Sequence, residues 1–270
     1  MISWINGQAA NGVTVQNRGF AYADGLFETI AVHQQSALLW EQHLDRLKQG
    51  LQVLGINCDM TLLQEEVETL LSHAEGDCVL KLTVVRCSDG QRGFKPTASA
   101  SAQRILQLMP WQGSNQPIRI QHCETPLVCN PLLNGLKTLN ALQYVLAAAE
   151  LKEGFDEGVI CDLEGHIVEG TKSNLFWVNT SGVLVTPDLS KAGVNGVIRQ
   201  EILQRAKLDG IAVKVSTPTL DSLQAAREIF VTNSLVGVQS VHDYEGRELH
   251  AFEMAETIRE LLRGDIFEID

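Results

Sequence analysis

The chain lacks the features that mark membrane and secreted proteins. Its 270 residues contain no apolar run near the roughly 20 residues that a bilayer-spanning helix needs. The first residues do not combine a basic segment with a hydrophobic one, as a secretory signal does. We therefore expect no membrane association and a cytoplasmic location.

Metal-binding and disulfide patterns are also missing. The chain has six cysteines but no C-x-x-C pair, and neither His33 nor His43 belongs to a cluster with metal-ligand spacing. We expect reduced, mostly buried thiols, structural or exposed histidines, and no bound metal. The cysteines are Cys58, Cys78, Cys87, Cys123, Cys129 and Cys161.

Positive charge is scarce. The formal net charge is -12, and no Lys/Arg-rich run offsets it locally. Such a field opposes binding to nucleic acid. If the substrate is a small anion, a few arginines must gather in its pocket, because a guanidinium pairs well with carboxylate or phosphate.

The apolar patterns indicate a mixed α+β fold. The hydrophobic content of 44% is enough for a substantial core. An Asn11-Gly12 turn would join the short strands 2–5 and 14–16, and an amphipathic helix from Trp40 stops at Gly55. A stretch that contains Gly and Pro predicts a boundary between two domains. We expect a smaller N-terminal α/β domain, 1–113, a linker, 114–121, and a larger C-terminal domain, 122–270.

Two residues of the C-terminal half suggest chemistry. Lys137 comes just before a stretch with helical apolar spacing, and Glu169 follows it by 32 residues. An amine can form a Schiff base with an aldehyde cofactor, and an acid can hold the cofactor's pyridinium nitrogen. The apolar stripe that marks the helix consists of Leu139, Leu142, Val145, Leu146 and Ala149.

Taken in order, six segments resemble the fold-type IV pyridoxal-phosphate enzymes, which include D-amino-acid and branched-chain aminotransferases and aminodeoxychorismate lyases. The similarity covers nearly the whole chain. It implies two domains like those of D-amino-acid aminotransferases, the C-terminal one with helices around a β-barrel-like core that binds pyridoxal 5'-phosphate. The segments are Arg18-Gly19 with Asp24-Gly-Leu-Phe-Glu-Thr29, His43-Leu-Asp-Arg-Leu47, Gly135-Leu-Lys-Thr-Leu-Asn140, Glu169-Gly-Thr-Lys-Ser-Asn-Leu-Phe176, Gly193-Val-Asn-Gly-Val-Ile-Arg199 and Thr232-Asn-Ser234.

The resemblance assigns roles to particular residues. Lys137 would be the catalytic residue, bound to the cofactor as a Schiff base and able to move a proton. Glu169 would face the ring nitrogen. Arg46 and the helix start at Gly196 would bind the phosphate. The other expected cofactor contacts are Asn174, Val197, Ile198 and Ser234, with Asp24 and Glu28 as candidates for supporting the pocket.

Four segments narrow the resemblance: Trp4-Ile-Asn-Gly7, Tyr22-Ala-Asp-Gly-Leu-Phe-Glu-Thr-Ile30, Arg86-Cys-Ser-Asp-Gly-Gln-Arg-Gly-Phe94 and Gly135-Leu-Lys-Thr-Leu-Asn140. With these, the chain looks most like an aminodeoxychorismate lyase within the family. Such an enzyme is a carbon-oxygen lyase of folate biosynthesis that converts 4-amino-4-deoxychorismate to 4-aminobenzoate and pyruvate. The substrate carries two carboxylates, and we expect Arg92 to contact one of them and Phe27 to line the pocket. Phe94 stands where D-amino-acid enzymes tend to have histidine, which disfavours their carboxylate site.

Two alternatives remain open at this point. The same cofactor residues would serve a D-amino-acid or branched-chain aminotransferase. A binding or regulatory protein could also keep the scaffold, although intact Lys137, Arg46 and Glu169 argue against lost catalysis. By resemblance the active unit is a homodimer whose pocket is bordered by the partner subunit, with residues 26–27 and Trp111 as candidate interface contributors.

Overall fold

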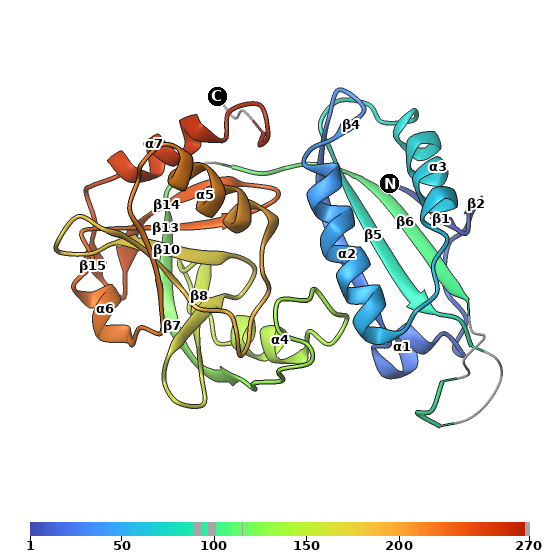
Figure 1. The fold of residues 1–270 in the computed structure, drawn as a ribbon, viewed down its shortest axis with the longest axis horizontal. Coiled ribbons are helices and arrows are strands. Elements are labelled where there is room, and N and C mark those ends of the chain that lie inside the picture. Colours follow the sequence, from blue (N-terminus) through green and yellow to red (C-terminus); the bar gives the residue numbers. More distant parts are fainter. Residues whose placement is uncertain (89–92, 97–100, 115, 268–270) are drawn as a thin grey trace. The chain divides into compact units, whose positions relative to one another are not determined.

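The structure, a computed structural model, describes residues 1–88, 93–96, 101–114 and 116–267. It divides into two compact units, each built around its own sheet (Figure 1). Unit 1 comprises Met1–Gln112 and Leu136–Asn140, and unit 2 comprises Gly113–Gly135 and Ala141–Asp270. In the described part of the chain, no helix is both long enough and apolar enough to cross a membrane.

Unit 1 is a two-layer structure with an antiparallel six-stranded sheet. The strand order is β2-β1-β6-β5-β3-β4, so the long strands β3, β5 and β6 lie beside one another. The strands are β1 (Ile2–Ile5), β2 (Gln8–Ala9), β3 (Gly25–His33), β4 (Ser36–Ala37), β5 (Cys78–Arg86) and β6 (Ala102–Pro110), and the short helix α1 (Arg18–Tyr22) precedes β3.

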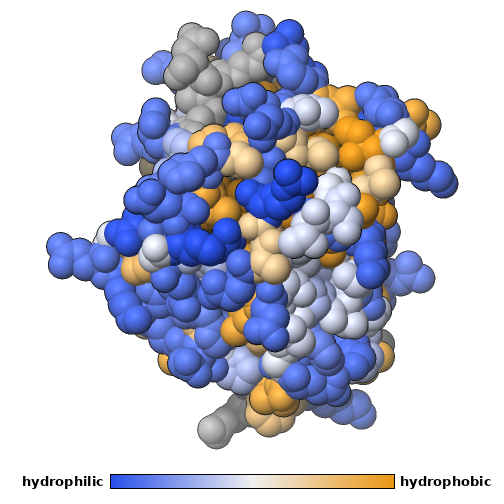
Figure 2. All heavy atoms as spheres, turned by 90° about the vertical axis from the view of Figure 1, so that its left-hand side faces the viewer, coloured by the Kyte–Doolittle hydropathy of each residue, from blue (hydrophilic) through white to orange (hydrophobic). Residues whose placement is uncertain are grey.

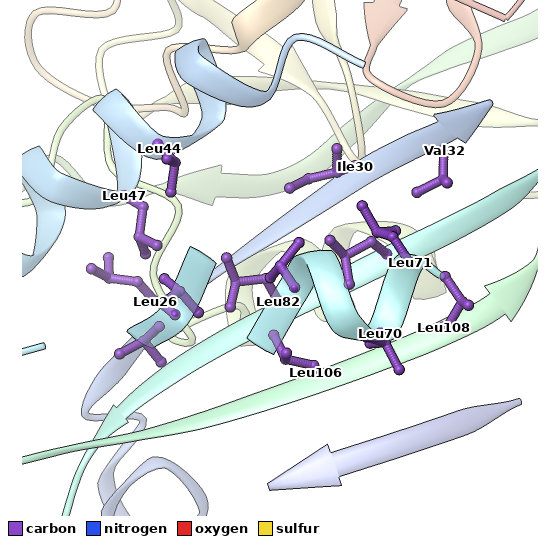
Figure 3. Close-up of a cluster of buried hydrophobic side chains, with 14 of the residues drawn as sticks. Leu26, Ile30, Val32, Leu44, Leu47, Leu70, Leu71, Leu82, Leu106 and Leu108 are labelled. Carbon is purple, nitrogen blue, oxygen red and sulfur yellow. The ribbon is translucent and has the colours of Figure 1, made fainter. Parts of the chain in front are cut away.

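Two helices, α2 (Trp40–Leu54) and α3 (Met60–Leu71), supply the second layer. Their apolar side chains meet those of β3, β5 and β6 in one buried cluster (Figure 3). The helix expected from Trp40 to the stop at Gly55 is confirmed, since Gly55 adopts φ 61° at its C-terminus. Burial of this apolar stripe is the main stabilising term of such a layer.

The first hairpin differs from the prediction. Strand β1 is confirmed, but its partner β2 follows immediately, and the turn lies at Asn6-Gly7, where φ is 49° and 74°. Residues 14–16 form no strand. Both Asn-Gly pairs carry the same turn signal. The structure uses Asn6-Gly7, where the Arg104 N–H donates to the Asn6 Oδ1 at 2.9 Å.

Unit 2 contains a nine-stranded mixed sheet in the order β12-β11-β10-β13-β14-β7-β8-β9, with β15 paired to β14. The parallel pairs are β7 with β8, β7 with β14, and β11 with β12. The strands are β7 (Ile118–Leu127), β8 (Glu157–Asp162), β9 (Ile167–Gly170), β10 (Asn174–Val178), β11 (Leu184–Pro187), β12 (Val213–Ser216), β13 (Glu228–Asn233), β14 (Gly237–Tyr244) and β15 (Arg247–Glu248).

The strands β8, β9, β10 and β11 of unit 2 are buried along their whole length. Strands buried on both faces read as continuous apolar runs. The face of unit 2 that lies on the left in Figure 1 is mostly hydrophilic, with small hydrophobic patches (Figure 2). The helices are α4 (Leu142–Ala149), α5 (Val197–Leu208), α6 (Leu220–Gln224) and α7 (Glu253–Leu261).

The α+β class with two units is confirmed, and two boundaries differ from the expected ones. Residues 118–121, placed in the linker, form the first part of β7. Residues 136–140, placed in the C-terminal domain, belong to unit 1, because Leu26 and Thr138 form an antiparallel bridge. The segment that carries Lys137 is therefore an addition to the edge of β3.

Candidate cofactor site

A buried carboxylate lies at the end of β9 in unit 2. Glu169 is 3% exposed and accepts hydrogen bonds at both oxygens. The Tyr144 hydroxyl donates to Oε1 at 2.5 Å, and the Asn174 Nδ2 donates to Oε2 at 3.0 Å. The Val194 N–H lies 3.0 Å from each oxygen. So many donors favour the ionised form, which makes the group a fixed negative charge in the interior.

Asn174, the first residue of β10, connects this carboxylate to the start of α5. Besides Glu169, its Nδ2 reaches the Val194 carbonyl at 2.9 Å, and its Oδ1 accepts from the Gly196 N–H at 3.1 Å. A Cβ at position 196 would lie 2.0 Å from that Oδ1, so only glycine fits there. Asn174 therefore holds Glu169 and the start of α5 in place, and its expected contact with the cofactor stays a prediction.

The N-terminus of α5 has the properties of an anion site. Gly196 is its N-cap, no side chain in the described part of the chain caps it, and its first turn has no acidic residue. Val197 and Ile198 follow, as expected, at the first helical positions. The first amides of a helix lack intrahelical partners and carry the positive end of the helix dipole. A phosphate fits this position.

Hydroxyl groups gather at the end of β13. Thr232 lies opposite Asn174 in the ladder between β10 and β13 and is 1% exposed. Its Oγ1 has no hydrogen-bond partner within the described residues. An unpaired buried hydroxyl is costly unless a ligand or water satisfies it. Ser234, expected to add a hydroxyl to the phosphate site, lies two residues further along, in the turn that follows β13.

Lys137 belongs to unit 1 and lies in an extended segment. We expected it just before a helix, but α4 begins five residues later, at Leu142. The Phe27 N–H donates to the Lys137 carbonyl at 3.0 Å, and the Lys137 Nζ lies 4.5 Å from the Phe27 ring centroid. The aromatic face favours the ammonium at that position. Phe27, expected to line a substrate pocket, is thus a direct neighbour of the expected catalytic amine.

Arg46, on α2, is buried against a carboxylate of β3. Its Nε donates to the Glu28 Oε1 at 2.8 Å, and its Nη2 donates to Oε2. The His43 Nδ1 lies 2.6 Å from the same Oε2. All three side chains are nearly inaccessible. This network fixes the guanidinium, and Glu28, expected only as pocket support, is its anchor.

The protonation of this network follows from its partners. Burial alone would raise the pKa of Glu28, but the charge and hydrogen bonds of Arg46, with help from His43, lower that pKa to about 2. Burial lowers the pKa of His43, against the opposite pull of Glu28. At neutral pH the network therefore contains an anionic Glu28, a cationic Arg46 and a neutral histidine.

Other predicted positions are outside this arrangement. Arg92 lies outside the described residues. Phe94 is highly exposed, and the Arg18 Nη2 donates to its carbonyl at 2.9 Å. Asp24 pairs with Arg18 and Arg86, so it supports α1 and β5 rather than a pocket. His33 pairs with an aspartate on the surface.

Sequence reasoning missed Tyr144. It lies on α4, seven positions after Lys137, between the residues of the predicted apolar stripe. That stripe is turned outward, because Leu142, Val145 and Leu146 are 65%, 60% and 52% exposed. The inward face carries Tyr144 and Ala147, which pack against a buried cluster. The sequence signal that could have identified it is its position on the helix face opposite the apolar stripe.

Known proteins share this architecture. The profile of the family Amino-transferase class IV matches residues 25–244. An aminodeoxychorismate lyase from Vibrio harveyi is 32% identical over 248 residues, which covers 88% of this chain and 89% of that protein. A putative branched-chain-amino-acid aminotransferase from Methanocaldococcus jannaschii is 30% identical over 259 residues, with 92% and 88% covered.

A solved structure agrees with these matches. The crystal structure of 4-amino-4-deoxychorismate lyase from Pseudomonas aeruginosa superposes with a TM-score of 0.91 and 39% sequence identity, and it covers 98% of this chain and 99% of its own. The match by profile and the match by structure both extend over the two units. The chain belongs to the class IV aminotransferase family.

This class IV family depends on pyridoxal 5'-phosphate, so the expected cofactor is confirmed. The residues present fit it. In the described part of unit 2, the buried anion at Glu169 suits a ring nitrogen, and the uncapped start of α5 and the unpartnered Thr232 hydroxyl suit a phosphate. Lys137, in unit 1, carries an amine that can react with an aldehyde.

The network in unit 1 predicts that Glu28→Gln destabilises the fold at neutral pH and much less in acid. The variant leaves the Arg46 charge buried without its counter-ion, which should lower the free energy of unfolding by about 3–5 kcal/mol at pH 7. The folded pKa of about 2 lies below the ordinary 4.5, so the carboxylate stabilises the fold above pH 4.5 and this contribution is lost as the pH falls toward 2.

Urea titrations of the wild type and Glu28→Gln at several pH values check this prediction. The two should differ most near neutrality and converge below pH 4.5. Glu41→Gln, an exposed position on the same helix, is the control and should change stability by less than about 0.5 kcal/mol. Equal unfolding midpoints at pH 7 would show that the pair does not stabilise the fold.

Proposed function

We propose that this chain is an aminodeoxychorismate lyase, which converts 4-amino-4-deoxychorismate to 4-aminobenzoate and pyruvate. The proposal is carried by the likeness to the Pseudomonas aeruginosa lyase, which is 39% identical and spans nearly the whole of both chains. The branched-chain aminotransferases from Thermoproteus uzoniensis and Escherichia coli are 22% identical. In this proposal, the chain supplies 4-aminobenzoate to folate biosynthesis.

Lys137 is the proposed catalytic residue. Its Nζ would hold the cofactor through the aldehyde group and, once released by the substrate amine, would take the proton from the amine-bearing carbon of the substrate. The neighbouring Phe27 ring, whose centroid lies 4.5 Å from this Nζ, would restrict where the amine can lie. When bound, pyridoxal 5'-phosphate supplies a conjugated ring that accepts electron density from that carbon.

Glu169 is proposed to bind the ring nitrogen and keep it protonated. Its two oxygens are fixed by donors from α4, β10 and the residue three positions before α5, so the negative charge is held in place before the cofactor binds. A preorganised charge of this kind contributes more than a mobile one, because no reorganisation is needed at the moment of reaction. This is the role that the sequence motif assigned to it.

The phosphate is proposed to bind at the start of α5. The amides of Val197 and Ile198 would donate to it, and the Thr232 or Ser234 hydroxyl would add a third donor. Arg46 would add a full positive charge whose direction Glu28 fixes through two hydrogen bonds. On the substrate side, Phe27 and Arg92 remain the proposed contacts, the arginine for one of the two carboxylates.

An aminotransferase of branched-chain or D-amino acids is the second candidate. The relative from Methanocaldococcus jannaschii favours it, because its identity to this chain is only slightly below that of the Vibrio harveyi lyase. Lys137, Glu169 and the phosphate site would perform the same tasks in either reaction. Products, rather than cofactor binding, therefore distinguish the two.

A product assay tests the proposal. The purified protein with pyridoxal 5'-phosphate and 4-amino-4-deoxychorismate should release 4-aminobenzoate and pyruvate, measured by fluorescence and by lactate dehydrogenase coupling. Lys137→Ala should lower the rate by roughly a thousandfold or more, because it removes both the cofactor amine and the base. Lys152→Ala, at an exposed position, is the control and should keep the rate.

The same protein is assayed with D-alanine, leucine, isoleucine or valine plus 2-oxoglutarate. Glutamate formation without 4-aminobenzoate would contradict the lyase and support the aminotransferase. A protein that shows no cofactor absorbance after addition of pyridoxal 5'-phosphate, and no reaction in either assay, would support a binding protein instead.

The proposed assembly is a homodimer. The outward face of α4 exposes Leu142, Val145 and Leu146, and an apolar helix face of this size is typical of a protein interface. Leu26 cannot contribute as we expected, because it is 2% exposed in the core of unit 1.

Light scattering after size-exclusion chromatography should give the mass of two chains for the wild type. Val145→Glu should shift the protein toward one chain, since a charge would be buried in the interface. Leu208→Glu, which changes an exposed leucine at the end of α5, should leave the dimer intact. A monomeric wild type, or a Val145→Glu dimer of unchanged strength, would contradict this assembly.

A further inference from the structure

We infer that Tyr144 is a positioning residue that keeps the Glu169 carboxylate ionised and correctly turned, so that the proton shared with the cofactor stays on the ring nitrogen. The inference rests on the proposed cofactor site and adds to it a residue of α4. Its basis is the hydrogen bond from the Tyr144 hydroxyl to the Glu169 Oε1.

This bond is shorter than the hydrogen bonds that Glu169 accepts from Asn174 and Val194. Tyr144 donates at 2.5 Å, whereas Asn174 and Val194 donate at 3.0 Å. The single Val194 N–H is divided between the two oxygens. Removal of the phenol would therefore leave Oε1 with only a share of one amide among these donors, while Oε2 would keep its own amide from Asn174.

The tyrosine is held in place by packing. Its ring lies against the buried cluster of unit 2 to which Ala147 and Val168 belong. Val168 directly precedes Glu169 in β9, so the same cluster positions both the donor and the acceptor. The hydroxyl thus points at Oε1 because of the fold, and not because of a flexible surface contact.

The direction of this hydrogen bond is fixed by electrostatics. Burial raises the pKa of Tyr144 well above its ordinary value, and the charge of Glu169 and the hydrogen bond raise it further. The hydroxyl therefore keeps its proton and acts as a donor throughout the range in which the protein is folded. A donor to an ionised carboxylate stabilises the charged form and lowers its affinity for a proton.

The consequence concerns the ring nitrogen. In a pair formed by a pyridinium and a carboxylate, the proton moves toward the group that becomes more basic. Without the Tyr144 hydroxyl the Glu169 carboxylate is more basic, and the nitrogen loses part of its proton. A tyrosine that only filled space would have no such effect, because phenylalanine fills nearly the same volume.

The inference is tested by asking whether loss of the Tyr144 hydroxyl weakens binding only of a ligand that has the ring nitrogen. Apo wild type and Tyr144→Phe are titrated with pyridoxamine 5'-phosphate, which cannot attach to Lys137, and with its analogue in which a ring CH replaces the nitrogen. Tyr144→Phe should weaken binding of the nitrogen-containing ligand by about tenfold and leave that of the analogue nearly unchanged, since hydrogen bonds to charged groups are the strong ones.

A second measurement reports the proton itself. The 15N resonance of ring-labelled pyridoxamine 5'-phosphate should move toward the value of a neutral pyridine in the Tyr144→Phe complex. Tyr244→Phe is the control: it removes a hydroxyl from another buried tyrosine of unit 2, in a different hydrophobic cluster, and should change neither the ligand preference nor the resonance.

Each outcome has one meaning. Equal weakening of both ligands in Tyr144→Phe, or no weakening, together with an unchanged 15N resonance, would overturn the inference while the proposed function stands. A wild type that binds neither pyridoxal 5'-phosphate nor pyridoxamine 5'-phosphate would overturn the proposed function, and the inference with it.

Discussion

The buried carboxylate of Glu169 is the constraint on which the site in unit 2 depends. A charge that is 3% exposed is tolerated only if hydrogen bonds replace its water. The fold supplies them from three places in the sequence, on α4, on β10 and just before α5. Because Asn174 also binds the Gly196 N–H, the same contacts set where the helix begins. Asn174 therefore links the proposed position for a ring nitrogen to the proposed position for a phosphate.

Unit 1 also contains a buried carboxylate that its neighbours stabilise. Glu28 on β3 is buried with Arg46 and His43 on α2, and the pair of opposite charges makes burial possible. Lys137 is attached to the same strand through the backbone of Phe27. Its segment begins at Gly135, which pairs with Val194, a donor to Glu169.

The sequence predicts two kinds of feature well. One is an element whose packing partners lie close to it along the chain, and the other is a residue within a motif of several characteristic residues. The helix α2 and its stop at Gly55 followed from local periodicity, because its apolar stripe has a single neighbour, the sheet of unit 1. The choice of Glu169, Lys137 and Gly196 came from their residue types and context. Their roles toward the cofactor stay predictions, which the buried environment of Glu169 and the glycine N-cap of α5 support.

The remaining features depend on contacts between distant segments. Periodicity identified the helix α4 but could not tell which face is buried, since α4 has an apolar outer face as well as an inner one. Lys137 lies in an extended segment because it pairs with β3, more than a hundred residues away in the sequence. Tyr144 reaches Glu169 across 25 positions, and no local pattern reports such a bond.

The central claim is that this chain holds pyridoxal 5'-phosphate through the amine of Lys137. Reduction of the cofactor-loaded protein with borohydride, followed by proteolysis and mass spectrometry of the peptides, tests it most directly. The account predicts a single modified peptide, with the pyridoxyl group on Lys137. Modification of a different lysine, or of none, would contradict it.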